Sequence, residues 1–281
     1  MSNMILSENT SLAFKESDGY FNDIRDVDWV RKKDRFNQMP NCKLNCESDE
    51  ATHWFQNNFE PTFSCQHERR IGGLGDGPKW VCDPHRIRPE NCLIYSIGSN
   101  NDFSFEEAVF RDISPQCEVH TFDPSIGETP SYKPHNVHFH PWGIGPSTTV
   151  NAEGWEMKTV TEIVKLLKHE NRSIDLFKID CEGCEFDTFE SWLQAGVNIR
   201  QILVEVHGGT YAEGEIGAIP AERMLAGLQK HGYVMFHKEP NTLGCGGWCI
   251  EFSFLKLNIS FQVPFKQQIK QSLVLRRSKL T

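Results

Sequence analysis

From Asn91 to Lys256, short apolar runs alternate with segments that have the spacing of amphipathic helices. Within residues 159–170, for example, Val160, Ile163 and Val164 recur at the i, i+3, i+4 spacing of a helix face, and residues 174–180 are then expected to form a buried strand. Strands that alternate with helices indicate a mostly parallel, doubly wound α/β sheet. This alternation is the feature that most restricts the fold.

The last strands of the series differ from the others in how they are connected. Segments with strand composition are residues 92–98, 117–125, 136–146, 174–180, 201–208, 233–239 and 247–256, and helical segments are residues 99–113, 159–170, 185–196 and 220–232. Only residues 240–247 separate the last two strands, which is too short for a helical crossover, so we expect them to be antiparallel neighbours. A parallel sheet that ends in one antiparallel hairpin is typical of class I methyltransferases.

The region before residue 91 is polar and rich in glycine and proline. We divide the chain into an N-terminal extension (1–61), a cysteine-containing cap (62–90), the α/β domain (91–257) and a C-terminal tail (258–281). The glycine-rich stretch 69–84 does not fit a P-loop, because no strand precedes it and no Lys-Ser/Thr pair follows. Cys65 and Cys82 are a candidate disulfide in the cap.

Composition limits the possible partners more than it limits the compartment. A net charge of −9 over 281 residues argues against binding to nucleic acid by phosphate neutralisation, and the apolar runs are too short for a membrane span. The start of the chain lacks the features of a secretory signal, which indicates the cytosol. Ten cysteines and the Asn-x-Ser/Thr sequons at Asn9, Asn171 and Asn258 indicate the secretory pathway instead. The sequence leaves both compartments open.

Residues at the carboxyl ends of the first strands predict a binding site for an adenosine cofactor, because ligands of open α/β sheets bind there. The first strand ends in a segment that contains Tyr95, Gly98, Ser99 and Asn100, where glycine permits a close backbone approach. Asp123 ends the second strand, where a carboxylate can accept both ribose hydroxyls. Residues that can form an adenine slot lie at the end of the third strand, namely Trp142, Gly143 and Ile144.

Polar residues at the ends of the fourth and fifth strands predict the reaction centre. Asp180 ends the fourth strand, Glu182 lies in the next turn, and Glu205 with His207 ends the fifth strand. Carboxylates and an imidazole at this place can position a substrate, accept a proton or hold a divalent cation. We choose His207 as the base, because its unperturbed pKa lies near neutrality. Asp180 or Glu182 is the alternative.

Two groups of residues have the spacing of metal or redox sites. Cys181 and Cys184 form a CxxC pair, to which Cys245 and Cys249 can be added as a zinc set, although packed thiols or a structural disulfide are the preferred interpretation. His135, His138 and His140 lie on or near one strand, but no completing carboxylate or thiol is evident beside them. We therefore predict no metal.

The segments 92–110, 117–124, 174–193 and 201–208 resemble the methyltransferase-like domain family related to the FkbM-type methyltransferases, and "KID-x-EG-x-E" is their most specific element. This resemblance implies a seven-stranded class I fold and S-adenosylmethionine as methyl donor. It implies that Gly98 and Ser99 contact the methionine end, Asp123 the ribose, and Asp180 with Glu182 the reaction centre.

The resemblance also implies O-methylation, of a small-molecule or glycan-like acceptor that the sequence does not identify. Two other functions stay open. A nicotinamide-dependent oxidoreductase would need a Gly-x-Gly-x-x-Gly loop, and Ser99 and Asn100 follow Gly98 instead. The second alternative is a secreted interaction domain that has kept the fold and lost catalysis.

Overall fold

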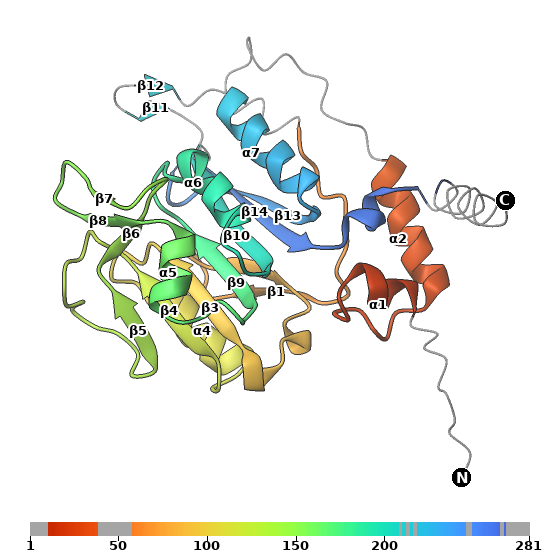
Figure 1. Ribbon diagram of the computed structural model, residues 1–281, viewed down its shortest axis with the longest axis horizontal. Helices are drawn as coiled ribbons and strands as arrows, with labels where there is room; N and C mark the ends of the chain where they lie inside the picture. Colours follow the sequence, from red (N-terminus) through yellow and green to blue (C-terminus); the bar gives the residue numbers. More distant parts are fainter. Residues whose placement is uncertain are drawn as a thin grey trace, which may run out of the picture. The chain divides into compact units, whose positions relative to one another are not determined.

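The computed structural model describes residues 11–38, 58–207, 210–211, 214–215, 218–245, 249–264 and 267. The chain forms two compact units. One unit comprises Met1–Pro40 with Leu257–Thr281, and the other comprises Asn41–Lys256. Figure 1 shows the elements of both units along the chain. The four-part division proposed from the sequence stays a prediction.

The larger unit is built on a seven-stranded sheet with the order β13-β14-β10-β9-β3-β4-β5. Its strands are β3 (Leu93–Ile97), β4 (Glu118–Phe122), β5 (Val137–His140), β9 (Ile174–Ile179), β10 (Ile199–His207), β13 (Tyr233–Asn241) and β14 (Cys249–Lys256). The pairs among β5, β4, β3, β9 and β10 are parallel, whereas β14 runs antiparallel to both β10 and β13. The class I arrangement with one antiparallel strand is thus confirmed.

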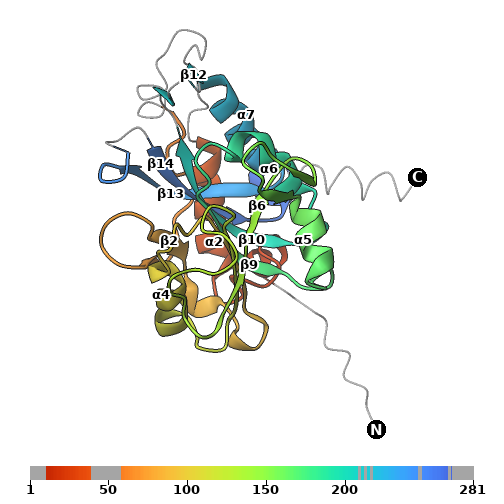
Figure 2. The same cartoon turned by 90° about the vertical axis from the view of Figure 1, so that its left-hand side faces the viewer.

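Three helices cover one face of this sheet, and Figure 2 shows α5 and α6 on the side opposite α4 and β2. The covering helices are α5 (Val160–Leu166), α6 (Glu185–Leu193) and α7 (Ala218–Lys230). Their apolar faces contribute Ile163, Trp192 and Leu225 to a buried core, which also contains Phe177 and Val204 of the central strands. The helical spacing seen in the sequence therefore corresponds to the faces that the core buries.

The other face of the sheet is covered by α4 (Ser104–Asp112) and by a hairpin of β1 (Glu68–Ile71) and β2 (Lys79–Cys82). The hairpin corresponds to the glycine-rich stretch 69–84, which was not counted among the segments with strand composition. The predicted disulfide between Cys65 and Cys82 is confirmed. The amide of Gln201 on β10 accepts from the backbone N–H of Cys82 and donates to its carbonyl, which fastens β2 to a polar sheet face.

The predicted third strand 136–146 is divided into two. β5 ends at His140, and β6 (Trp142–Ile144) belongs to a separate small sheet with β7 (Thr149–Val150) and β8 (Glu156–Lys158). Pro141 lies between the two strands and has no N–H with which to continue the ladder. The remaining short elements are β11 (Thr210–Tyr211), β12 (Gly214–Glu215), and the 3-10 helices η1 (Pro84–Arg86) and η2 (Pro89–Asn91).

The smaller unit contains α1 (Leu12–Glu16), α2 (Asp26–Gln38) and the 3-10 helix η3 (Ile259–Gln262). Its buried aromatic side chains enclose an ionic group, in which the Lys33 ammonium donates to Glu16 at 2.5 Å and to the Ser260 carbonyl at 2.6 Å. The Trp29 indole donates to the same Glu16 carboxylate at 2.7 Å. Because these groups are buried, their pairing satisfies charges that would otherwise oppose folding. In the described part of the chain, no helix combines the length and apolar composition needed to cross a bilayer.

Candidate active site

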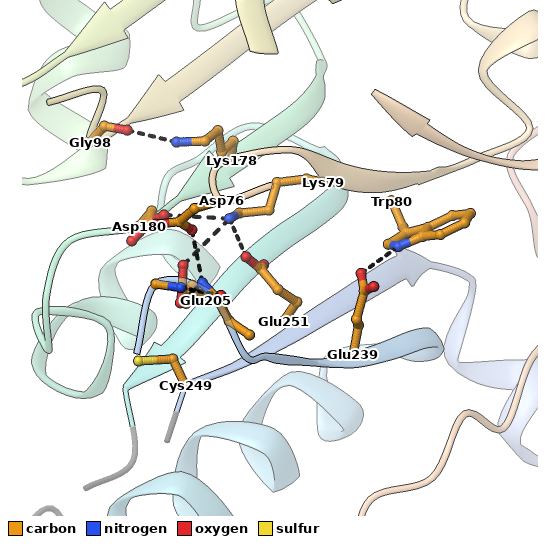
Figure 3. Close-up of polar contacts among 12 residues, drawn as sticks. Asp76, Lys79, Trp80, Gly98, Lys178, Asp180, Glu205, Glu239, Cys249 and Glu251 are labelled. Carbon is orange, nitrogen blue, oxygen red and sulfur yellow. Dashed lines mark hydrogen bonds and ion pairs between the residues drawn. The ribbon is translucent and has the colours of Figure 1, made fainter. Parts of the chain in front are cut away.

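The turn after β3 brings the ends of two parallel strands into direct contact. Gly98 has a φ of +77°, and a Cβ placed on it would lie 1.7 Å from the backbone oxygen of Asp180. The Lys178 ammonium on β9 donates to the Gly98 carbonyl at 2.6 Å (Figure 3). Only glycine fits between these neighbours, because any side chain would overlap backbone atoms. Gly98 and Asp180, predicted separately from the sequence, are therefore adjacent.

Asp123 at the end of β4 holds the residues that follow Gly98. Its Oδ2 accepts from the backbone N–H groups of Ser99 at 2.8 Å and Asn100 at 2.7 Å, and its Oδ1 accepts from Ser125. Burial opposes ionisation of this carboxyl, but these hydrogen bonds outweigh it and lower the pKa of Asp123. The ribose contact stays a prediction, and the contacts present here make Asp123 the anchor of the turn.

The other predicted cofactor residues separate into two places. Gly143 packs against the end of β4, since a Cβ on it would lie 3.2 Å from Pro124 Cγ, and Trp142 stacks on His140. This position is next to Asp123 through Pro124, and the adenine slot stays a prediction. The side chain of Tyr95, in contrast, is buried, and its hydroxyl lies 2.8 Å from His169 Nδ1. Tyr95 therefore takes part in a different group of residues.

Two of the three predicted catalytic carboxylates, Asp180 and Glu205, contact a buried lysine (Figure 3). The Lys79 ammonium lies 2.5 Å from Glu251, 3.4 Å from Asp180 and 3.7 Å from Glu205, and its side chain is 1% exposed. Glu205 also accepts from the Asn241 amide at 2.8 Å. We name Lys79, Asp180, Glu205 and Glu251 the lysine–carboxylate cluster. Three carboxyl groups and one ammonium in a buried place must share protons, because separate negative charges there would be costly.

Two carboxyl groups of this cluster, Glu205 and Glu251, have raised pKa values, and burial is the largest cause for both. Burial and the charges of Asp180 and Glu251 raise the pKa of Glu205 to about 8, against the opposing effect of Lys79. At Asp180 burial acts in the same direction, but Lys79 and Lys178 outweigh it and lower its pKa to about 2. Near neutral pH, Asp180 is therefore ionised and Glu205 is protonated, and the two side chains share a hydrogen bond.

His207, the last residue of β10, is held by Glu185 at the start of α6. Both its backbone N–H and its Nδ1 contact Glu185 Oε1, at 2.7 and 3.0 Å. Its Nε2 lies 3.8 Å from Asp180 Oδ1 and 3.5 Å from Glu182 Oε2. Burial opposes protonation, but the hydrogen bond and charge of Glu185, with Asp180 and Glu205, raise the pKa of His207 to about 9. The choice of His207 as base rested on its unperturbed pKa near neutrality, and the contact with the buried Glu185 raises the pKa above that value.

Glu182 differs from its neighbours in exposure. Its side chain is 72% exposed and its backbone has a φ of +56°, a conformation that non-glycine residues adopt infrequently. It precedes Gly183, whose N–H donates to Glu185 at 3.0 Å. Of the four predicted catalytic residues, Glu182 is the most accessible to a ligand arriving from solvent.

The cysteines near the site are paired in disulfides. Cys181 bonds to Cys184, and Cys245 bonds to Cys249. The alternative of a zinc set made of these four thiols is therefore wrong, because disulfide sulfur is no longer a thiolate ligand. The structural-disulfide interpretation of the CxxC pair is confirmed.

Sequence reasoning missed Lys79, Glu251 and Lys178. Glu251 alternates with apolar residues along β14, a signal that one face of that strand meets polar groups. Lys79 is 172 residues from Glu251 and lies in a four-residue strand, so no local pattern indicated the pair.

The chain is similar to known methyltransferase proteins. A family model described as a methyltransferase domain matches residues 11–256. The probable methyltransferase-like protein 24 of Homo sapiens is 29% identical over 129 residues, which are 44% of this chain and 34% of that protein. The probable methyltransferase-like protein 24 of Rattus norvegicus is 29% identical over 128 residues, which are 44% of this chain and 35% of that protein. The chain therefore matches about a third of the length of these relatives.

Two solved structures are among those to which the chain is similar. The fibrillarin pre-rRNA processing protein of Methanococcus jannaschii has a TM-score of 0.38 and 9% identity, over 69% of this chain and 84% of that one. The 1,6-didemethyltoxoflavin-N1-methyltransferase of Burkholderia thailandensis was solved with S-adenosylhomocysteine. It has a TM-score of 0.35 and 12% identity, over 59% of this chain and 72% of that one. The specific relation to FkbM-type enzymes stays a prediction. The match of the family model over most of the sequence shows that the chain belongs to a family of methyltransferase domains.

Proposed function

We propose that this chain is an S-adenosylmethionine-dependent methyltransferase that acts on a hydroxyl oxygen of a small-molecule or glycan-like acceptor. Family membership supports methyl transfer. The observation that carries the choice of oxygen is the Asp180–Glu205 pair beside the Gly98 turn, in which one carboxyl is ionised and the other has a pKa of about 8. A hydroxyl acceptor must lose a proton as it is methylated, and this pair can receive it.

The residues present fit the methyl donor. S-adenosylmethionine carries a sulfonium cation and an ammonium group, and it supplies an electrophilic methyl group when bound. The ionised Asp180, 18% exposed beside Gly98, and the exposed Glu182 would hold these positive charges. The turn at Ser99 and Asn100, anchored by Asp123, would hold the methionine and ribose parts.

The chain's own residues then have distinct tasks. Asp180 accepts a hydrogen bond from the acceptor hydroxyl and fixes its oxygen in position, which is the main source of rate enhancement in such a displacement. The hydroxyl proton passes to the Asp180–Glu205 pair in the form that has lost its own shared proton. Lys79 and the protonated His207 stabilise the negative charge of that pair. His207 in this arrangement is a positioned cation, and the base is the carboxyl pair.

The disulfides support an oxidising compartment for this protein. The described residues contain four of them: Cys65–Cys82, Cys92–Cys117, Cys181–Cys184 and Cys245–Cys249. Disulfides persist in the secretory pathway and outside the cell but are rare in the cytosol. We therefore propose that the protein works in the secretory pathway or extracellularly.

Calorimetric titration with S-adenosylmethionine and S-adenosylhomocysteine tests the cofactor. We expect saturable binding of both ligands and a large loss of affinity in Asp123→Ala, because the Ser99 and Asn100 N–H groups lose their acceptor. A 2′-deoxyribose analogue separates a direct ribose contact from anchoring of the turn. If Asp123 contacts the ribose directly, the wild type should bind the analogue more weakly than the parent ligand. Asp123→Ala should then bind the two with equal affinity.

The matched control is Asp187→Ala, an exposed carboxylate in the first turn of α6, which should bind as the wild type does. A folded wild-type protein that binds neither ligand would contradict the proposal and favour the non-catalytic interaction domain. If it binds, methyl-labelled donor is incubated with hydroxyl, amine and thiol acceptors, and label on amines alone would contradict O-methylation.

The rate of methyl transfer should depend on pH in a bell-shaped manner. It should rise through about pH 8, as the Asp180–Glu205 pair loses its shared proton and becomes the stronger base. It should fall through about pH 9, as His207 loses the charge that stabilises this pair. The rise and the fall of the rate describe the titration of Asp180, Glu205 and His207 together. The measurement is kcat as a function of pH, with an acceptor found among the hydroxyl compounds tested above.

An NMR titration of the His207 imidazole tests whether this residue causes the fall of the rate at high pH, and it needs no acceptor. The His207 ring should titrate near pH 9, and Glu185→Gln should lower its pKa by removing the charge at Nδ1. Glu190→Gln, which changes an exposed glutamate of the same helix, is the control and should leave it unchanged. A His207 ring that is neutral at pH 7 in the wild type would contradict the assigned role.

A further inference from the structure

A second group of titratable side chains lies on the sheet face that contains Tyr95 and Phe122, away from the lysine–carboxylate cluster. It consists of Glu118 and His120 on β4, His140 on β5, His169 after α5, and Tyr95 on β3. We name these five residues the histidine cluster. His120 and His169 are buried, whereas the Glu118 side chain is 35% exposed and reaches solvent. None of them has a task in the proposed methyl transfer.

Three ligand atoms of the cluster converge on one point. Glu118 Oε1 lies 2.9 Å from His120 Nε2 and 3.1 Å from His169 Nε2, and all three atoms lie within 4.8 Å of one another. In a tetrahedral zinc site with bonds of about 2.0–2.2 Å, ligand atoms are separated by roughly 3.3 Å. A small relaxation of Glu118 therefore opens the space for an ion between these atoms.

The outer partners of these ligands are also in place. His120 Nδ1 lies 2.9 Å from His140 Nε2, and His169 Nδ1 lies 2.8 Å from the Tyr95 hydroxyl. Zinc-binding imidazoles nearly always have such a partner at the second ring nitrogen, which fixes the tautomer. Arg172 pairs with Oε2 of Glu118 and leaves Oε1 directed at the imidazoles.

Burial favours the neutral charge state of these imidazoles, which is the charge state of a metal-binding histidine. Burial is the largest cause that lowers the pKa of both His120 and His140, to about 4, and it also lowers the pKa of His169. Neutral rings need not lose a charge to become ligands, so no protonation penalty opposes binding at neutral pH.

We propose that Glu118, His120 and His169 form a binding site for Zn²⁺, with a water molecule as the fourth ligand. In the metal-bound state each imidazole binds through Nε2 and carries its one proton on Nδ1, where it donates to His140 or Tyr95. Two nitrogen ligands and one carboxylate oxygen select zinc over magnesium or calcium, which prefer oxygen-only sites. The site would join β4 to the segment after α5.

Titration of the untagged full-length chain with Zn²⁺, in competition with a chromophoric chelator, tests this proposal. We expect one equivalent bound by the wild type and none at this site in Glu118→Gln or His169→Gln. Tyr95→Phe removes an outer partner and should weaken binding by about 10–100-fold. His135→Gln, which removes an exposed histidine outside the cluster, is the control and should bind as the wild type does.

A second measurement makes the result independent of variant folding. Zn²⁺ should raise the Tm of the wild type, and Co²⁺ in its place should give the visible spectrum of a four-coordinate nitrogen and oxygen site. Absence of stoichiometric binding by the folded wild type would overturn the proposal. So would binding of equal affinity in both ligand variants, because the metal would then lie elsewhere in the chain.

Discussion

Lys79→Met should lower the free energy of unfolding by about 3–5 kcal/mol, since one partner of a buried ionic group is removed. The substitution keeps the length of the side chain but withdraws the ammonium that contacts Glu251, Asp180 and Glu205. The remaining carboxyl groups must then take up protons or repel one another. Chemical denaturation, followed by far-UV circular dichroism with the disulfides intact, measures the change.

Two further variants isolate the cause of this loss. Lys165→Met changes an exposed lysine of α5 and should alter stability by no more than about 0.5 kcal/mol. The double variant Lys79→Met with Glu251→Gln removes one of the stranded charges and should recover part of the stability. A loss below about 1 kcal/mol in Lys79→Met would show that the ammonium does not hold the cluster together.

Gly98→Ala should lower the free energy of unfolding by about 3 kcal/mol or more and abolish binding of S-adenosylhomocysteine. Two causes add: the positive φ of +77° is unfavourable for alanine, and its Cβ would lie 1.7 Å from the Asp180 backbone oxygen. Relief of that overlap must separate the ends of β3 and β9, and with them the cofactor turn from the reaction centre.

Gly196→Ala is a closely matched control. Gly196 also has a φ of +77°, but a Cβ there would have no neighbour within 4 Å. It should therefore cost only the backbone strain, about 1–2 kcal/mol, and leave ligand binding unchanged. Equal losses of stability in the two variants would contradict the role assigned to the contact between Gly98 and Asp180.

Local sequence patterns were sufficient for the fold. Apolar runs and helical spacing located each strand of the seven-stranded sheet, and the short connection 240–247 indicated that β14 is antiparallel to β13. The break between β5 and β6 was not foreseen, although Pro141 was visible. An apolar run on both sides of a proline has the same composition whether or not the ladder continues.

Local patterns also located much of the candidate site. Gly98, Asp123, Asp180 and His207 each stand at a strand end, and the carboxyl ends of parallel strands meet at one edge of a sheet. Their position therefore followed from the predicted order of elements, before any contact was known.

Only the tertiary structure decided what these residues contact and which charges they carry. Lys79 reaches Glu251 across 172 residues because the β1–β2 hairpin covers the polar face of the sheet, and Glu118 reaches His169 because α5 returns the chain to β4. The raised pKa values of Glu205 and His207 depend on these neighbours and on burial. A sequence pattern records periodicity and turns, whereas proton affinity depends on charges brought together by the fold, and these have no fixed separation along the chain.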